Sequence, residues 1–272
     1  MVTGANSGIG LETARGLARE GFHVVMLCRN AERAEAAKAD IETSVPGADL
    51  EIVLGDLGEL ASVRRAAAEI LHRLDRLDVL VNNAGITLRE RAQTSEGNEA
   101  MWATNHLGPF LLTDLLLPLL KASAPSRIVN VASAAHRWGR IRFDDIQATK
   151  GYGFMSFPRY GDTKLMNILF TRELATRLEG TGVTANCLHP GAVATNIGAP
   201  PKLVAWGTKL ILKSPEQGAQ ASLRLATDPA LATTTGSYFD GRRNIDKKLS
   251  KRARDRDLGR RLWHLTEELV DA

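Results

Sequence analysis

Short apolar runs alternate with longer amphipathic segments along the whole chain. Five of the apolar runs have the length of a β-strand, at residues 23–28, 50–54, 77–81, 127–131 and 183–188. Segments with a helical period follow them, such as residues 61–74 and 160–178. Nearly continuous apolar strands separated by helices are typical of a parallel sheet that is covered on both faces. Because crossovers between such strands are right-handed, we predict an α/β fold with a doubly wound parallel sheet, a Rossmann fold.

The organisation along the chain indicates a single domain, since no linker, repeat or low-complexity segment divides residues 1–272. Two residues, Met1 and Val2, precede the glycine-rich turn, whereas a strand of about five residues usually feeds such a turn. We therefore expect a truncated first strand; a misassigned start, a cut chain and a sheet that tolerates a short strand are all open explanations. Residues 197–215 are expected to form a substrate lid and residues 246–272 a helical tail.

The composition is that of a globular protein, with 44% hydrophobic and 24% charged residues. The net charge is +4, and much of the basic excess lies in residues 242–261. No stacking aromatic residues are interleaved with these basic residues. We therefore interpret them as a solvated helix face and expect no nucleic acid partner.

The two cysteines, Cys28 and Cys187, lie in apolar runs, which favours buried thiols in a reducing compartment over a disulfide. No signal peptide precedes the first motif. The most apolar run, residues 107–120, is interrupted by Asp114 and Pro118 and is too short to cross a bilayer. We therefore expect a cytoplasmic protein without an integral membrane segment.

A glycine-rich turn at residues 3–10 leads directly into a helix. Glycines between a strand and a helix let the backbone approach a pyrophosphate, and the helix N-terminus supplies free N–H groups. The spacing is Gly-x-x-x-Gly-x-Gly, and a purely structural turn would use the same residue type. We interpret the turn as a nucleotide site with contacts from Gly4, Asn6, Ser7, Gly8, Ile9 and Gly10.

The end of the second strand bears on the choice of cofactor. A ribose 2′-hydroxyl is bound by a carboxylate at this position, whereas a 2′-phosphate is bound by a guanidinium. Residues 28–30 contain no acid but include Arg29, which could also be a solvated surface arginine. The sequence therefore favours NADP (NADPH) over NAD. Asp56 and Leu57 follow the third strand as candidates for the adenine end, although Asp56 could equally cap the next helix.

Tyr160 and Lys164 are four residues apart at the start of an amphipathic helix, so their side chains share a face. A phenol with a pKa of about 10 is a poor base at neutral pH, and a nearby ammonium lowers that pKa toward the working range. Ser133 ends the strand 128–132, at the carboxyl edge of the sheet where ligands bind in such folds. Asn105 lies in a helical stretch after the Asn-Asn-Ala-Gly turn.

Together these motifs resemble those of the short-chain dehydrogenases/reductases, in the compact single-domain branch. In order they are Thr-Gly-x-x-x-Gly-x-Gly, Asn-Asn-Ala-Gly, the helical Asn, the strand-end Ser, Tyr-x-x-x-Lys and Pro-Gly, all within residues 3–195. The resemblance implies an oxidoreductase in which Tyr160 is the general acid/base and Ser133 hydrogen-bonds the substrate oxygen. It further implies that Lys164 holds the nicotinamide ribose and lowers the Tyr160 pKa, and that Asn105 holds a water of a proton relay.

The resemblance also implies further cofactor contacts. On the adenosine side they are Asn83, Ala84 and Gly85. At the nicotinamide end they are Pro190, Gly191, Val193 and Thr195. Asn82 and Gly85 could equally be turn formers. The family suggests a homodimer or homotetramer, and the helical tail could block or replace the usual contacts.

One departure from the family pattern bears on the substrate. Ser133 and Tyr160 are 27 residues apart, about twice the family's common spacing. The segment 136–157, the pair Cys28-Arg29 and the tail 260–269 resemble the retinol-dehydrogenase-like subgroup. This resemblance implies a lipophilic aldehyde, ketone or alcohol as the small-molecule substrate. The apolar residues of the lid could line its pocket, touch a membrane surface or pack on the core.

Two other functions stay open. One is a catalytically silent NADP-binding protein, which the complete Ser/Tyr/Lys/Asn set argues against and the truncated strand weakly favours. The other is an epimerase or dehydratase, although those enzymes have a different glycine spacing and a larger substrate domain. His136 and His189 have no further ligands at metal-like spacing, so we expect no metal site.

Overall fold

The computed structural model describes residues 1–152, 156–193, 213–241, 243–244 and 246–271. In this part of the chain eight strands form one sheet, in the order β3-β2-β1-β4-β5-β6-β7-β8. The strands are β1 (Val2–Thr3), β2 (Val24–Cys28), β3 (Leu50–Leu54), β4 (Val79–Asn82), β5 (Ser126–Val131), β6 (Val183–His189), β7 (Tyr238–Asp240) and β8 (Arg243–Asn244). Neighbouring strands are parallel except for the antiparallel pair β7 and β8. With β1 in the middle and crossovers to both sides, the predicted doubly wound fold is confirmed.

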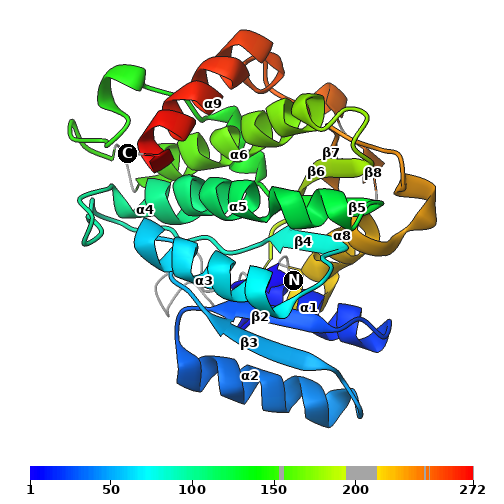
Figure 1. Cartoon of the computed structure of the whole chain (residues 1–272). Helices are drawn as coiled ribbons and strands as arrows, with labels where there is room; N and C mark the ends of the chain where they lie inside the picture. The colour runs from blue at the N-terminus through cyan, green and yellow to red at the C-terminus, as the bar shows by residue number, and fades with distance from the viewer. Residues whose placement is uncertain (153–155, 194–212, 242, 245, 272) are drawn as a thin grey trace.

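Helices connect the strands and cover both faces of the sheet (Figure 1). They are α1 (Gly8–Arg19), α2 (Ala31–Ser44), α3 (Leu60–Arg73), α4 (Ala100–Trp102), α5 (Gly108–Ala122), α6 (Phe157–Arg177), α8 (Pro215–Thr227) and α9 (Arg256–Asp271). A π-helical segment, η1 (Ala103–Leu107), joins α4 to α5. The catalytic helix was expected to begin at Tyr160 but begins at Phe157, because Pro158 is well suited to the first turn, where its missing N–H costs no hydrogen bond.

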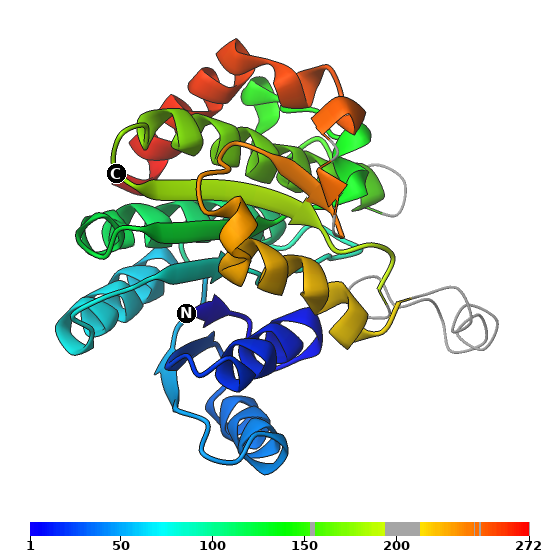
Figure 2. The same cartoon turned by 90° about the vertical axis from the view of Figure 1, so that its right-hand side faces the viewer.

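Successive residues of β2 divide the hydrophobic core into two layers. Val25 and Leu27 face one cluster, whereas Val24, Met26 and Cys28 face the other, because side chains alternate along a strand. The first cluster contains side chains of α3, α5, α6 and α9, and the second contains side chains of α1, α2 and α8. Figure 2 shows α1 and α8 lying side by side. Both faces of the sheet are therefore covered, which leaves the ends of the strands as the place for a site.

The first strand is short, as expected. Val2 pairs with Met26 of β2 and with Val81 of β4, and Thr3 pairs with Leu27. Two residues are thus enough to bring the following glycine-rich turn to the carboxyl edge of the sheet, between β2 and β4.

The expected helical tail is part of the core. Helix α9 lies along α6 (Figure 1) and buries Trp263, which is 5% exposed. The indole ring centroid is 4.8 Å from that of Phe110 on α5 and 5.8 Å from that of Phe170 on α6. Because α9 closes the cluster that α5 and α6 share, it stabilises α6, the helix that carries Tyr160.

Two further expectations concern the cysteines and the membrane. Cys28 and Cys187 are both free and buried, as their apolar surroundings indicated. Burial raises the pKa of the Cys28 thiol to about 11, so it stays protonated. Among the described helices, none has the length and apolar character needed to span a bilayer.

Candidate active site

The glycine-rich turn between β1 and α1 forms a cradle that has no room for a side chain at Gly4 or Gly10. Gly4 and Gly8 have φ angles of +64° and +54°, a region that favours glycine. A Cβ atom at Gly10 would lie 2.3 Å from the Gly4 carbonyl oxygen and 2.4 Å from Asn83 Nδ2. Ser7 precedes α1 in an extended conformation, and its side chain does not cap the helix in the described structure. The first N–H groups of α1 therefore lack a side-chain acceptor, which suits a phosphate.

Thr3 holds this cradle against the loop after β4, a role that the sequence analysis missed. Its hydroxyl oxygen accepts hydrogen bonds from the N–H groups of Asn83 and Ala84, each at 3.0 Å. Asn83 Nδ2 donates in return to the Thr3 carbonyl oxygen at 2.9 Å. A fully buried polar residue at the end of a central strand is the signal that could have pointed to it.

The structure distinguishes Asn82 from Gly85, the two residues that could equally have been turn formers. Asn82 is structural, because its Nδ2 donates to Thr113 Oγ1 and to Asn130 Oδ1, both at 2.9 Å. Gly85 lies beside two of the predicted catalytic side chains: a Cβ atom there would be 3.3 Å from Asn105 Oδ1 and 3.4 Å from Lys164 Nζ. Gly85 thus lets the loop after β4 pass close to both side chains.

At the predicted adenosine end, Arg29 is an exposed side chain beside Asp56. Its Nη1 lies 3.5 Å from Asp56 Oδ2, while Asp56 Oδ1 accepts a hydrogen bond from the Gly58 N–H at 2.8 Å. Asp56 therefore braces the turn after β3. Leu57 is 4% exposed and its side chain belongs to the core, so the cofactor contact of this residue stays a prediction for its backbone.

The predicted catalytic residues come together at the end of β5. Lys164 Nζ lies 5.5 Å from the Tyr160 ring centroid and donates a hydrogen bond to the Val131 carbonyl oxygen at 3.0 Å. Ser133 follows β5 and accepts a hydrogen bond from the Ala135 N–H at 3.2 Å, and its side chain is close enough to that of Tyr160 to influence the tyrosine pKa. Serine, tyrosine and lysine are thus gathered at the carboxyl edge of the sheet.

The electrostatics of this group differ from the expectation. Burial raises the pKa of Tyr160 to about 12, and the hydrogen bond to Ser133 opposes this only in part. Burial also lowers the pKa of Lys164 to about 8. The expected lowering of the tyrosine pKa is therefore wrong for the chain by itself, because desolvation of the buried phenolate is the largest influence on this pKa. At neutral pH the phenol is a protonated donor.

Asn105 lies in the π-helical segment η1, and protein groups occupy its carboxamide. Its Oδ1 accepts from the Ile86 N–H at 2.7 Å, and its Nδ2 donates to the Ile86 carbonyl oxygen at 2.9 Å and to Thr163 Oγ1 at 3.1 Å. Thr163 Oγ1 donates to the Tyr160 carbonyl oxygen at 2.9 Å. Asn105 thus braces the catalytic helix through Thr163, which the sequence analysis missed, while the expected water relay stays a prediction.

The predicted nicotinamide contacts are described in part. Gly191 has a φ angle of +93°, and a Cβ atom there would lie 2.8 Å from Lys213 Nζ. Val193 forms an isolated β-bridge with Lys213. Pro190 is buried at the end of β6. Thr195 and most of the expected lid, residues 197–212, lie outside the described residues.

The two histidines near the site do not form a metal centre. His136 is fully buried, and its Nδ1 lies 2.8 Å from the Ser133 carbonyl oxygen. Burial lowers the pKa of His136 and of His189, so both rings favour the neutral form. No group of three or more metal-ligating side chains is present in the described part of the chain.

Comparison with known proteins agrees with this geometry. A family model described as short chain dehydrogenase matches residues 1–202. Retinol dehydrogenase 14 of Mus musculus is 43% identical over 290 residues, which cover 99% of this chain and 85% of the mouse protein. Retinol dehydrogenase 13 of Homo sapiens is 42% identical over 283 residues, which cover 99% of this chain and 83% of the human protein.

Solved structures show the same fold. The crystal structure of an uncharacterized protein from Mycobacterium Paratuberculosis has a TM-score of 0.80 and 35% identity, covering 99% of this chain and 92% of that chain. A short chain dehydrogenase from Shigella flexneri, complexed with NADP, has a TM-score of 0.71 and 27% identity, covering 89% of this chain and 95% of that chain. The similarity therefore extends beyond the cofactor-binding half.

Proposed function

Because this chain belongs to the short-chain dehydrogenase family, we propose that it transfers a hydride between NADP(H) and a carbonyl or alcohol, with Tyr160 as the general acid/base. The observation that carries the proposal is the convergence of Tyr160, Ser133 and Lys164 at the end of β5. The glycine cradle opens at the same edge of the sheet, one strand away across β4. A bound nicotinamide would supply or accept the hydride.

The protein's own contribution is the proton. In the reductive direction the Tyr160 phenol donates its proton to the substrate oxygen as the hydride adds to the carbonyl carbon, and the product is an alcohol. The raised pKa of Tyr160 keeps the phenol in the acid form that this step needs. Ser133 hydrogen-bonds the same oxygen and so orients the substrate carbonyl toward Tyr160. In the oxidative direction the phenolate removes the hydroxyl proton.

Lys164 is suited to hold hydroxyl groups of a cofactor ribose. An ammonium has three N–H donors, and one of them is directed at the Val131 carbonyl oxygen. The two other donors are available beside Tyr160 and Gly85. This side chain can therefore bind the cofactor and orient it against the phenol.

The choice of NADP rests on the surroundings of β2 and on the cradle. The side chain of Arg29 is 69% exposed, so a 2′-phosphate can reach its guanidinium without displacing core groups. The uncapped N-terminus of α1 and the closely packed Gly4 and Gly10 fit a pyrophosphate. The Shigella flexneri neighbour, whose structure contains NADP, supports the same cofactor for this chain.

A lipophilic substrate is supported by the relatives and by two exposed aromatic side chains close in sequence to Ser133 and Tyr160. The similar proteins are named retinol dehydrogenases. Trp138 and Phe157 are 60% and 50% exposed, and their ring centroids are 5.2 Å apart. Trp138 follows Ser133 by five residues and Phe157 precedes Tyr160 by three. An exposed aromatic pair close in sequence to Ser133 and Tyr160 fits a substrate with a large apolar part.

The proposal is tested by an NADPH-oxidation assay against a panel of lipophilic aldehydes and ketones, retinal included. Turnover of at least one of them, with lower kcat/KM for NADH than for NADPH, is the expected result. Cofactor binding without turnover of any carbonyl or alcohol would instead support the silent NADP-binding protein.

A further inference from the structure

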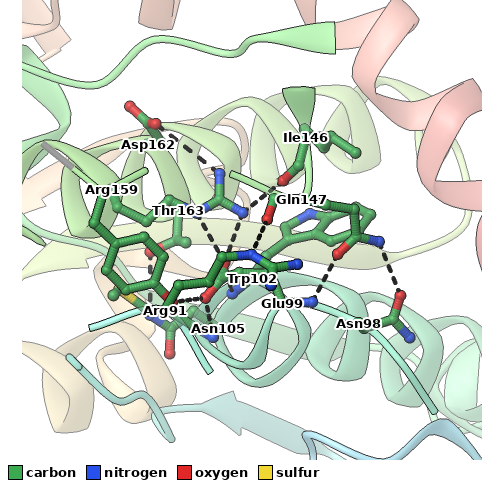
Figure 3. Close-up of polar contacts among 12 residues, drawn as sticks. Arg91, Asn98, Glu99, Trp102, Asn105, Ile146, Gln147, Arg159, Asp162 and Thr163 are labelled. Atoms are coloured by element: carbon green, nitrogen blue, oxygen red, sulfur yellow. Dashed lines mark hydrogen bonds and ion pairs between the residues drawn. The ribbon is translucent and has the colours of Figure 1, made fainter. Parts of the chain in front are cut away.

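A buried carboxylate outside the catalytic group accepts four hydrogen bonds and forms an ion pair. Glu99 is fully buried and caps α4, where its side chain accepts from the N–H groups of Met101 at 2.7 Å and Trp102 at 2.9 Å. It also accepts from Arg159 Nε at 2.8 Å, and Arg159 Nη2 lies 2.6 Å from the same carboxylate oxygen as an ion pair. The fourth hydrogen-bond donor is the Tyr152 hydroxyl. Figure 3 shows the Arg159 guanidinium directed at this carboxylate.

Arg159 is buried as well, with 4% of its side chain exposed. It lies in the first turn of α6, directly before Tyr160. Besides Glu99, its Nη2 donates to the Ile146 carbonyl oxygen at 2.6 Å, and its Nη1 lies 4.0 Å from Asp162 Oδ2. The guanidinium thus has partners for its charge and for several N–H groups, as a buried charge requires.

The pair joins three parts of the site. Glu99 begins the helical stretch that contains Asn105 six residues later. Arg159 lies in the first turn of α6. Ile146 and Tyr152 belong to the long segment between Ser133 and Tyr160, and Gln147 of the same segment accepts from the Glu99 N–H at 2.7 Å. The two helices therefore have two buried cross-links, Glu99 to Arg159 and Asn105 to Thr163 (Figure 3).

We propose that Glu99 and Arg159 are positioning residues, which hold the first turn of α6 so that the Tyr160 phenol meets Ser133. This inference rests on the proposed function, in which Tyr160 is the proton donor. Neither side chain is placed in contact with the reacting atoms. Their effect acts through the backbone of α6, since Arg159 is bonded to Tyr160 and its guanidinium is fixed at three points. A displacement of the phenol by about 1 Å is enough to lower a rate by about a hundredfold.

A purely structural pair would affect stability alone, so the variants are chosen to separate the two roles. Arg159→Met leaves the Glu99 carboxylate buried without its cation. The double variant Glu99→Gln with Arg159→Met removes both charges and keeps an acceptor for the α4 cap. Arg159→Lys keeps the charge but loses the planar, forked geometry. The matched control is Arg15→Met, since Arg15 is also buried and pairs with Asp40 at 2.6 Å, away from Tyr160.

The first measurement is kcat per folded molecule together with the NADPH dissociation constant. We expect the double variant to lose about tenfold to a hundredfold in kcat while NADPH binding changes by less than about twofold. Arg159→Lys should recover part of the loss, and Arg15→Met should lower the melting temperature with kcat unchanged. A double variant that keeps the wild-type kcat would overturn the proposal, as would an equal loss of kcat in Arg15→Met.

The second measurement does not depend on turnover. The chain has three tyrosines, so the NMR signals of 13Cζ-labelled tyrosine can be assigned by single substitutions to phenylalanine. In the double variant we expect the Tyr160 signal and its titration to shift, while those of Tyr238 stay in place. An unchanged Tyr160 signal and titration would overturn the positioning role. If the wild-type protein turns over no carbonyl and the double variant still shows the shift, the proposed function is refuted while the positioning role is kept.

Discussion

The Lys164 ammonium donates a hydrogen bond to the carbonyl oxygen of Val131 at 3.0 Å, and Val131 lies two residues before Ser133. The same strand end therefore carries Ser133 and the anchor of the lysine. Lys164 is 2% exposed. The geometry of the catalytic group is thus set by a strand and a helix rather than by loops, which favours a fixed arrangement before substrate binds.

The buried ammonium makes stability depend on alkaline pH. Burial lowers the pKa of Lys164 from 10.5 to about 8, so between these values the unfolded chain binds more protons than the folded one. The free energy of unfolding contributed by this group therefore rises with pH across that window. We expect the melting temperature of the wild type to rise relative to that of Lys164→Met between about pH 8 and about pH 10. If the difference between the two melting temperatures stays constant across this pH range, Lys164 is not desolvated.

The raised pKa of Tyr160, about 12, makes the two directions of the reaction respond differently to pH. Reduction uses the protonated phenol, so the titration of Tyr160 by itself leaves kcat/KM for a carbonyl nearly flat from about pH 6 to about pH 9. Oxidation uses the phenolate, whose fraction grows about tenfold for each pH unit below the pKa. We expect kcat/KM for the matching alcohol to rise throughout this range. An alcohol profile that reaches a plateau near pH 7 would indicate a phenol with a much lower pKa.

Arg29 should set the cofactor preference. Removing the guanidinium in Arg29→Ala takes away the charge that would bind the 2′-phosphate, so we expect NADPH binding to weaken by at least about tenfold. NADH binding should change little, because NADH has no phosphate at that position. Fluorescence titration with both cofactors measures this, with Arg19→Ala, an exposed arginine at the end of α1, as the control. Equal losses for both cofactors would make Arg29 a general surface residue.

The contribution of α9 to the core can be measured at Trp263. The side chain is 5% exposed between Phe110 and Phe170, so Trp263→Ala leaves a cavity and should lower the free energy of unfolding by about 3–5 kcal/mol. Trp138→Ala is the matched control, since that indole is 60% exposed, and it should change stability by less than about 0.5 kcal/mol. Similar urea denaturation curves for the two variants would mean that α9 is not part of the cooperative core.

Much of this arrangement could be predicted from the chain alone. The apolar runs became strands because a doubly covered sheet buries both faces of each strand, as in β2. The order of the motifs along the chain brought Ser133, Tyr160 and Lys164 to one edge, since parallel strands all end there. These features depend on local pattern and on topology.

Other features depend on burial in three dimensions. Glu99 and Arg159 are 60 residues apart, and charged residues are expected at the surface, so no pattern pointed to a buried pair. The pKa of Tyr160 was expected to fall because the spacing to Lys164 is visible in the sequence, whereas the desolvation that outweighs it is not. Leu57 follows the third strand like a ligand-binding residue, yet its side chain turns into the core.

The most direct test of the proposed function is the substitution Tyr160→Phe, measured as kcat/KM for carbonyl reduction alongside the NADPH dissociation constant. Phenylalanine keeps the ring and removes the hydroxyl, so kcat/KM should fall by about 10²–10⁴-fold while NADPH binding changes by less than about twofold. Tyr238→Phe, which removes a hydroxyl from a buried ring on β7, should keep most of the activity. A Tyr160→Phe protein that still reduces the substrate at the wild-type rate would contradict the assignment of Tyr160 as the proton donor.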